Sequence, residues 1–261
     1  MTDAGRVAAL AAGILSGDRK SLARGITLLE SVLPTDQDEG QSLVRQLQPR
    51  AGKSIRIGVT GAPGVGKSTL IDKLGARLLD QGLKVAVLTI DPSGVRSGGS
   101  ILGDKTRMHS LAHSEQAFVR PSPAGSHSGG VAAATGDSVL LCEAAGYDVV
   151  VVETVGVGQI EHGVRGLVEF LLLLIAPGAG DEVQALKFGI LEVVDCVAVT
   201  KADGALKSQA ELTRSSYEAA LSLTRGHDVM KVLTVSALQG EGIDAIWREI
   251  SDKHHALAAN Q

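Results

Sequence analysis

A glycine-rich segment, Gly61-Ala62-Pro63-Gly64-Val65-Gly66-Lys67-Ser68-Thr69, directly follows the apolar run 55–60. Its glycines let the backbone turn tightly and aim several N–H groups at the α- and β-phosphates of a nucleotide, where the next helix starts. Lys67 would add a positive charge near the β- and γ-phosphates, and Ser68 would place its hydroxyl on a Mg²⁺ ion. Thr69 is expected only to pack or to cap the helix. The segment therefore predicts a phosphate-binding loop.

The same segment has a less specific interpretation, a glycine-rich turn in which a lysine happens to fall. Two features count against it. Every position of the loop motif is filled, and an amphipathic helical pattern follows at once, with apolar residues Leu70, Ile71, Leu74 and Leu78. The motif thus identifies a nucleotide as the ligand and leaves the reaction open.

Acidic residues suited to a metal ion follow the next apolar run, 85–90. Asp91-Pro92-Ser93 places a carboxylate where it could reach Mg²⁺ directly or through water, although such sequences also cap turns. The stretch 96–108 is rich in glycine and then in charge, and is expected to form a loop that a γ-phosphate and Mg²⁺ can order. Asp104 in this stretch is a further candidate metal ligand, and Asp91 is a candidate for metal binding and catalysis.

A third apolar run ends in Glu153-Thr154-Val155-Gly156-Val157-Gly158-Gln159. A glycine in such a turn can give its backbone N–H to the γ-phosphate, and Gly156 fits that role. Glu153 could orient the attacking water or hold a magnesium-bound water, so it is a candidate for catalysis and for the metal. A purely structural turn would not require an acid at this position, and would not forbid one.

Two further segments predict how the base is recognised. Thr200-Lys201-Ala202-Asp203 follows the run 195–200, and a carboxylate there can accept from N1–H and from the exocyclic amine of guanine. Adenine offers no matching pair of donors, so Asp203 is the predicted base-reading residue. Lys201 would lay its stem along the purine. Ser236-Ala237-Leu238, after the run 231–235, would support the base through its backbone.

Composition limits the class of protein. The chain has 261 residues, and 44% of them are hydrophobic. Its net charge of −4 and its scattered Lys and Arg residues do not indicate a basic surface that binds nucleic acid. The two cysteines, Cys142 and Cys196, lie in apolar segments and offer neither a disulfide framework nor a Cys-x-x-Cys metal site. The longest apolar run, 170–176, is too short to span a bilayer, and the N-terminal residues lack a signal-peptide pattern. A soluble cytoplasmic protein without a membrane partner is expected.

The apolar pattern also predicts the elements that position these residues. Residues 1–50 repeat apolar residues at helical spacing in three stretches, and should form an N-terminal helical extension. Residues 51–261 should form a P-loop nucleotidase domain of α/β class, with a mostly parallel central sheet flanked by helices. Its ligands would bind beyond the carboxyl ends of the strands. The expected strands are 55–60, 85–90, 148–153, 169–175, 195–200 and 231–235, and the expected last helix runs from about Ile243 to Leu257.

Taken together, these segments resemble the methylmalonyl-CoA mutase-associated GTPases, the MeaB/ArgK/MMAA family of P-loop GTPases. The resemblance runs from about Leu22 to Ile250, and is carried by the phosphate loop, Asp91-Pro92-Ser93, 97–108, 153–161 and 177–182. It implies an enzyme that binds GTP and GDP with Mg²⁺ and hydrolyses GTP slowly. It further implies a chaperone that gates cofactor loading and protects an adenosylcobalamin-dependent acyl-CoA mutase. The segment matching 178–188 would act as an additional switch loop that communicates with the mutase.

Some positions depart from the family pattern. Thr200 stands where the family has asparagine, which alters one side-chain contact to guanine and to the phosphate loop. Gly94 and Ile160 replace serines, and Lys187-Phe188 replaces a pair of lysines. The C-terminal helical arm that relatives use to dimerise is nearly absent, which leaves a homodimer open. The identity of the mutase is open as well.

Two other functions compete with this interpretation. A nickel-insertion metallochaperone GTPase would need a metal site, but the spacing of the candidate histidines (His109, His113, His127 and His162) matches no compact ligand set. A P-loop kinase or transport-associated ATPase would need a second substrate pocket, which the sequence does not indicate. Asp203 argues against it, because a carboxylate there favours guanine.

Overall fold

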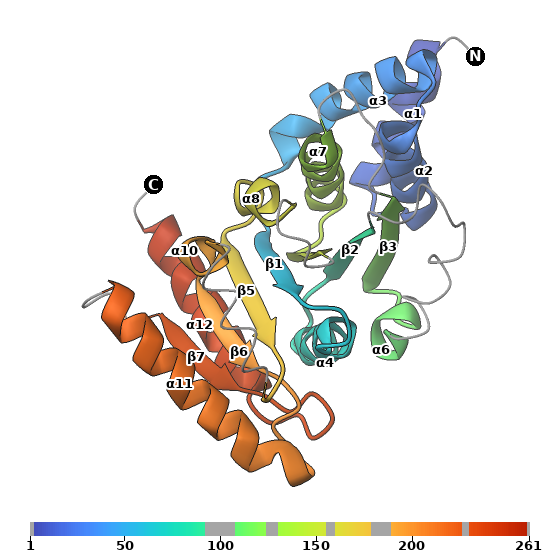
Figure 1. Ribbon diagram of the computed structural model, residues 1–261. Coiled ribbons are helices and arrows are strands. Elements are labelled where there is room, and N and C mark those ends of the chain that lie inside the picture. The colour runs from blue at the N-terminus through green and yellow to red at the C-terminus, as the bar shows by residue number, and fades with distance from the viewer. Residues whose placement is uncertain are drawn as a thin grey trace. The chain divides into compact units, whose positions relative to one another are not determined.

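The computed structural model describes residues 3–91, 108–123, 130–154, 160–178, 189–225 and 230–259. Within these residues the strands form one seven-stranded sheet, and the strand pairs with an assigned register are parallel. Helices flank the strands (Figure 1). The expected α/β class with a parallel sheet is therefore confirmed. The chain divides into two compact units, which are taken in turn.

The first unit combines Met1–Arg56 with Leu78–Val152. Its strands follow the order β3, β2, β4 in the sheet, and β4 reaches two residues beyond the unit. The helix α7 contacts α1, α2 and α3, so the N-terminal helices pack on a helix of the nucleotide domain. The elements are α1 (Asp3–Leu15), α2 (Arg19–Glu30), α3 (Pro34–Leu47), a 3-10 turn (Gln48–Arg50), β2 (Val85–Asp91), α6 (His109–Ala112), β3 (Ala117–Pro123), α7 (Gly130–Ala144) and β4 (Val149–Thr154).

The three N-terminal helices expected from the apolar spacing are present. Asp18 caps α2 by accepting from the backbone of Lys20 and Ser21, and the Ser21 hydroxyl that also donates to it lowers the pKa of this carboxyl. Gly25 allows a close approach of helices. A Cβ there would lie 2.9 Å from the Leu141 side chain and 3.0 Å from two others, Ile14 and Leu43. A larger residue would therefore push α1, α3 and α7 away from α2.

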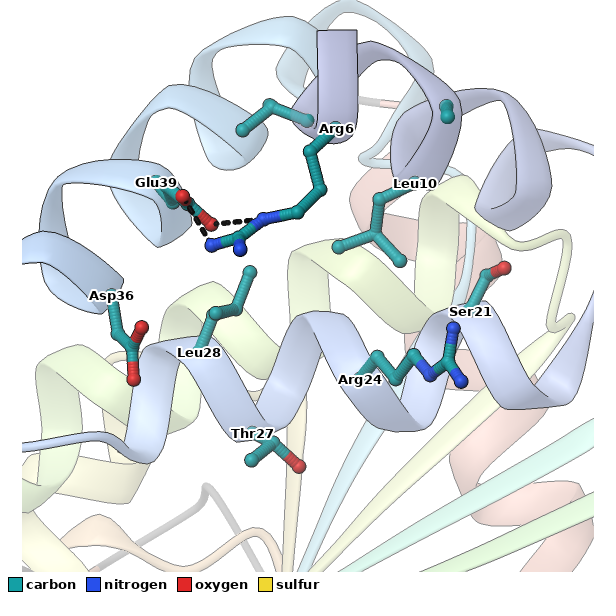
Figure 2. A pocket seen from close by; sticks show the side chains of 10 residues that line it. Arg6, Leu10, Ser21, Arg24, Thr27, Leu28, Asp36 and Glu39 are labelled. Atoms are coloured by element: carbon teal, nitrogen blue, oxygen red, sulfur yellow. Dashed lines mark hydrogen bonds and ion pairs between the residues drawn. The ribbon is translucent and has the colours of Figure 1, made fainter. Parts of the chain in front are cut away.

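A hollow of about 560 Å³ lies among α1, α2 and α3 (Figure 2). On its α1 side Arg6 pairs with Glu39 of α3, and its Nε atom donates to the carboxylate at 3.2 Å. Leu10 and Leu28 line its apolar part, and Arg24 of α2 is exposed beside them. The lining includes none of the residues that the sequence predicts for the nucleotide site.

The strand β3 was not expected from the sequence. Its apolar part, Ala117–Val119, is short, and Pro121 and Pro123 follow it. Prolines are tolerated here because β3 is an edge strand of the sheet, with β2 as its neighbour on one side. Glu30 at the end of α2 accepts from Arg120 and, at 2.6 Å, from the Ser122 hydroxyl. This long-range pairing holds the strand in place, and a local apolar pattern cannot reveal it.

The second unit combines Ile57–Arg77 with Glu153–Gln261. Its strands follow the order β1, β5, β6, β7, and β5 and β6 are buried along their whole length. The first two residues of β1 and the last three of α4 belong to the first unit. The helix α11 packs on β6 and β7, and α12 contacts β5 (Figure 1). The elements are β1 (Ile55–Gly61), α4 (Lys67–Asp80), α8 (Ile160–Arg165), β5 (Phe170–Ile175), α10 (Ile190–Val193), β6 (Cys196–Val199), a 3-10 turn (Gly204–Leu206), α11 (Lys207–Arg225), β7 (Lys231–Thr234) and α12 (Ile243–Ala258).

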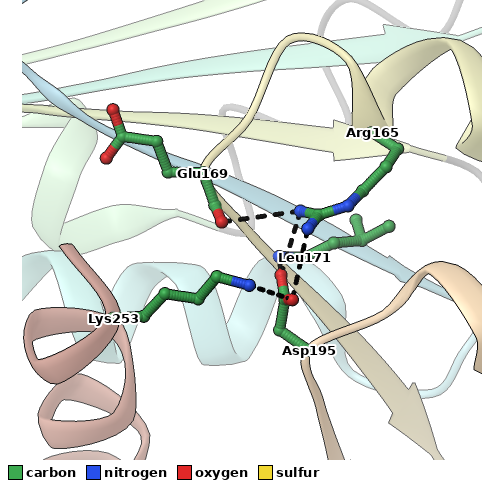
Figure 3. Close-up of polar contacts among 5 residues, drawn as sticks. All are labelled: Arg165, Glu169, Leu171, Asp195 and Lys253. Atoms are coloured by element: carbon green, nitrogen blue, oxygen red, sulfur yellow. Dashed lines mark hydrogen bonds and ion pairs between the residues drawn. The ribbon is translucent and has the colours of Figure 1, made fainter. Parts of the chain in front are cut away.

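A cluster of charges ties this unit together where β5 and β6 begin (Figure 3). The Asp195 carboxylate accepts from Arg165, at 3.0 and 3.3 Å, from Lys253, and from the backbone N–H of Leu171 at 2.7 Å. Nearby, His254 contacts the Glu169 carboxylate through Nδ1 at 2.8 Å. We call Arg165, Asp195, Lys253 and the Leu171 N–H the Asp195 cluster. It joins the end of α8, the starts of two strands and α12.

Candidate nucleotide-binding site

The phosphate loop connects β1, which ends at Gly61, to α4, which begins at Lys67. Gly61 has φ = 145°, and a Cβ there would lie 2.4 Å from the carbonyl oxygen of Leu174. The loop can pass this close to β5 only because the residue is glycine. Gly64 and Gly66 also have positive φ angles, of 76° and 107°. The sequence motif thus corresponds to a loop whose backbone a side chain would distort.

Lys67 lies inside this loop. Its side chain is 8% exposed, and its ammonium donates to the carbonyl oxygens of Gly61, at 2.7 Å, and Ala62, at 3.1 Å. Carbonyl oxygens are neutral partners, so phosphate oxygens with full negative charge would bind the ammonium more strongly. The lysine is therefore held in position for a phosphate that enters the loop.

Ser68 and Glu153 come together beside the lysine. The Ser68 hydroxyl donates to Oε1 of Glu153 at 3.1 Å, and the Glu153 side chain is 8% exposed. Glu153 reaches this place because β4 runs to Thr154. A hydroxyl and a carboxylate supply the hard oxygen ligands that Mg²⁺ prefers. The donor set of these two residues fits that ion.

The predicted base-binding segments line one cavity of about 340 Å³, which we call the base pocket. The segments follow two strands of the second unit, the buried β6 and the partly buried β7, and the loop and α4 supply further wall. The cavity therefore opens beside the phosphate loop, as a nucleotide requires. Its lining residues are Val65, Gly66, Thr69, Leu70, Thr200, Lys201, Asp203, Leu206, Val235, Ala237 and Leu238.

The acidic residue of the pocket is held in a fixed orientation. Asp203 accepts a hydrogen bond from the hydroxyl of Ser236, which is fully buried. The backbone N–H of Gln239 donates to the same hydroxyl at 3.1 Å, and the Ala202 N–H donates to the Val235 carbonyl at 3.1 Å. The two segments are thereby joined, and the free edge of the carboxylate is left for a ligand in the pocket.

Lys201 connects the base pocket to the phosphate loop. It has φ = 55°, a left-handed conformation that is uncommon outside glycine and asparagine. Its ammonium donates to the Gly64 carbonyl at 2.8 Å, which stretches the side chain along the pocket. Lys201 thus lines the base pocket and is bonded to the phosphate loop at the same time.

Three of the predicted residues cannot be placed in this way. Asp104 and Gly156 lie outside the described residues. The backbone of Asp91 ends β2, but its side chain is outside the described part as well. Of the predicted metal ligands, the structure therefore brings together Ser68 and Glu153.

Three lining residues were not among the predicted site residues, namely Leu70, Leu206 and Val235. Leu206 is 40% exposed and lines the pocket together with Leu238, a predicted residue that is 77% exposed. Leu70 and Val235 are buried. Leu206 follows Asp203 by one turn of 3-10 helix, and no pattern in the sequence marks it.

The described residues give no support to a metallochaperone site. No three His, Cys, Asp or Glu side chains among them gather as a metal-binding group. His113 contacts the carbonyl of His109 at 2.8 Å, a contact within one helical turn, and His127 lies outside the described residues. Both cysteines are buried, and burial raises the pKa of Cys196 to about 12. In the described part of the chain, no helix is long and apolar enough to cross a membrane.

Comparison with known proteins agrees with this geometry. GTPase ArgK from Escherichia coli is 47% identical over 94% of this chain and 75% of its own length. The mouse protein named methylmalonic aciduria type A homolog, mitochondrial, is 40% identical over 95% of this chain and 63% of its own length. A crystal structure described as a LAO/AO transport system kinase superposes with a TM-score of 0.82 at 38% identity, covering 98% of this chain and 77% of that one.

A weaker similarity concerns the fold alone. HypB from Helicobacter pylori in complex with nickel superposes with a TM-score of 0.56 at 15% identity, covering 83% of this chain and 93% of that one.

The model of the family described as methylmalonyl Co-A mutase-associated GTPase MeaB matches residues 22–261. With the identities above, this match confirms the resemblance found in the sequence: the chain belongs to the MeaB family of P-loop GTPases.

Proposed function

We propose that this chain binds Mg²⁺–GTP, hydrolyses it slowly, and acts as a chaperone of an adenosylcobalamin-dependent acyl-CoA mutase. In this role it gates the loading of the cofactor and protects the mutase from inactivation. The observation that carries the nucleotide part is the base pocket, because it places an oriented carboxylate beside a phosphate loop that holds a buried lysine.

Guanine recognition is assigned to Asp203. Its carboxylate accepts from N1–H and from the exocyclic amine, and the Ser236 hydroxyl fixes its orientation. With adenine the same carboxylate would face no pair of donors, and its free oxygen would lose water without gaining a hydrogen bond, which is costly. The stem of Lys201 covers one face of the purine, and Ala237 and Leu238 flank the base.

The phosphates and Mg²⁺ are assigned to the loop. Lys67 binds the β- and γ-phosphates, and Ser68 with Glu153 would hold Mg²⁺, which would offset the negative charge of the phosphates when bound. Glu153 also orients the attacking water or a water of the ion. Asp91 and Asp104 are proposed as further ligands, and the Gly156 N–H as the contact that senses the γ-phosphate.

The mutase is inferred as the partner from the description of the matching family and from the name of a relative. The matching family is described as associated with methylmalonyl-CoA mutase, and the mouse relative is named for methylmalonic aciduria. Efficient hydrolysis in P-loop GTPases usually requires a partner that completes the site, so a slow rate for the chain alone is expected. The segment 178–188 is proposed as the loop that communicates with the mutase.

The test is the rate of GTP hydrolysis during titration with a candidate mutase, with ATP as the control nucleotide. Saturable acceleration of GTP turnover without acceleration of ATP turnover supports the proposal. Turnover of ATP in preference to GTP would contradict the assignment of Asp203 and would favour a kinase or ATPase. Lack of acceleration by methylmalonyl-, isobutyryl- and hydroxyisobutyryl-CoA mutases would contradict the chaperone role and leave the GTPase assignment standing.

A further inference from the structure

Thr200 has a hydroxyl group whose single proton is already engaged. The side chain is 4% exposed, and Oγ1 lies 2.6 Å from the Val65 carbonyl of the phosphate loop and 3.2 Å from the Ile175 carbonyl. Both neighbours are acceptors, and a threonine hydroxyl has one proton to donate. The shorter distance assigns that proton to Val65. The hydroxyl thus joins the end of β6 to the phosphate loop.

Two backbone N–H groups beside this side chain, those of Thr200 and Ala202, are engaged as well. The Thr200 N–H donates to the Ile175 carbonyl at 2.9 Å, and the Ala202 N–H donates to the Val235 carbonyl at 3.1 Å. Neither they nor the hydroxyl has a proton left for a ligand in the base pocket. Thr200, which lines that pocket, therefore has no side-chain proton to donate to a ligand there.

The orientation of a bound guanine follows from the two ends of the pocket. Asp203 takes the N1 and amine edge of the six-membered ring, and the phosphates lie in the loop at Val65 and Gly66. The five-membered ring, which carries N7, then lies between them, next to Thr200. N7 is an acceptor, so it needs a donor that Thr200 does not have.

We propose that Thr200 is a positioning residue that braces the phosphate loop through Val65 and leaves N7 of the purine without a hydrogen bond from this position. The inference rests on the proposed binding of guanine nucleotide. Bracing of the phosphate loop and hydrogen bonding to N7 are two tasks that one side chain could perform together. Thr200 performs only the first. In this chain, position 200 holds the loop, and the side-chain hydrogen bonds that read guanine are assigned to Asp203.

The test compares the dissociation constants of GDP and 7-deaza-GDP, which differ only in the replacement of N7 by a C–H group. Both are measured by isothermal titration in the presence of Mg²⁺. We expect the full-length wild-type chain to bind them within about twofold of one another, because no hydrogen bond to N7 is lost. Binding of GDP at least fivefold tighter than 7-deaza-GDP would overturn the inference.

Two variants separate bracing from base reading. Thr200→Val keeps the shape and removes the hydroxyl, so both nucleotides should bind about fivefold more weakly, by equal factors, because the loop loses its brace. Thr200→Asn adds an amide whose N–H groups can donate to N7. This variant should therefore bind GDP at least fivefold more tightly than 7-deaza-GDP. Ser216→Ala is the matched control, because it removes a hydroxyl that donates to a carbonyl, Leu212, on the exposed side of α11.

The outcomes distinguish the inference from the function on which it rests. Unchanged GDP affinity in Thr200→Val would overturn the bracing role, and an unchanged ratio in Thr200→Asn would overturn the placement of N7 beside residue 200. Either result leaves guanine binding intact. If the wild-type chain bound neither nucleotide, the proposed function itself would fail, and the inference with it.

Discussion

Opposite ends of the same strands in the second unit carry two different kinds of polar network. Where β5 and β6 begin, the Asp195 cluster pairs charges of opposite sign, and the Asp195 side chain is only 12% exposed. Beyond the ends of β1 and β6, the buried Lys67 and the exposed Lys201 donate to main-chain carbonyls. The first network consists of ion pairs, and the second consists of charges held by neutral dipoles.

The difference shows how a rigid sheet can present an exchangeable site. An ion pair in a half-buried place is costly to break, because each charge would lose its partner without regaining full hydration. A lysine bonded to carbonyls can exchange them for phosphate oxygens, which are stronger acceptors. The ammonium keeps a hydrogen-bond partner throughout the exchange. The Asp195 cluster is therefore expected to control stability, and the loop lysine to control ligand affinity.

The largest expected effect concerns Lys67. Lys67→Ala should weaken the binding of GTP and GDP by more than about 100-fold, because the loop would lose its point charge near the phosphates. Thermal stability should change little, since the Gly61 and Ala62 carbonyls that accept from the ammonium can bind water instead. Isothermal titration measures the affinity. Lys73→Ala, at an exposed position of the same helix, is the control, and equal affinity in the two variants would refute the assignment of the phosphate loop.

Next in size is the effect at Asp203, the carboxylate proposed to read the base. Asp203→Asn replaces one acceptor by an amide donor, so GDP affinity should fall about 30-fold, in the range for lost hydrogen bonds to a charged group. Xanthosine diphosphate, which carries a carbonyl where guanine has its amine, should bind more tightly to the variant than to the wild type. Competition against a fluorescent GDP measures both changes. Retained preference for GDP over the xanthine nucleotide would exclude Asp203 as the base reader.

The sequence was most informative where function is local. The phosphate loop could be predicted because its residues are contiguous and glycine is required by its φ angles, as at Gly61. The segments proposed to read the base line one cavity, as the sequence predicts for segments that follow parallel strands of one sheet. By contrast, the bond from Thr200 to Val65 joins residues 135 positions apart, and no local pattern indicates it.

Contacts between residues far apart in the sequence also explain why β3 and the Asp195 cluster were not predicted. β3 depends on the pairing of Arg120 and Ser122 with Glu30, 90 and 92 positions away. The Asp195 cluster draws on α8, β6 and α12, and each of its residues looks like an ordinary surface charge in the sequence. Division of the chain into residues 1–50 and 51–261 remains a prediction.

The third effect concerns stability and not affinity. Asp195→Ala should lower the free energy of unfolding by about 2 kcal/mol, less than for a fully buried pair, because Arg165 and Lys253 keep 32% and 31% of their side-chain exposure. GDP affinity should stay within about twofold of the wild type. Urea unfolding and isothermal titration measure the two quantities.

The control for this variant is Arg77→Ala, which removes an ion pair with Asp244 whose side chains are 49% and 65% exposed. Such exposed pairs contribute less than about 1 kcal/mol. If both variants lost the same stability, the distinction between the two networks would not hold. If Asp195→Ala weakened GDP binding as strongly as Lys67→Ala does, the two ends of the strands could not be assigned separate roles.

The smallest expected effect tests how far orientation matters within the exchangeable site. Ser236→Ala removes the buried hydroxyl that donates to Asp203 and leaves the carboxylate in place. GDP affinity should fall about fivefold, the equivalent of one hydrogen bond, and the preference for guanine over xanthine should persist, because the reading atoms are unchanged. The same competition assay measures both. A loss as large as that of Asp203→Asn would mean that Ser236 contacts the base directly, and an unchanged affinity would mean that Asp203 keeps its orientation without this bond.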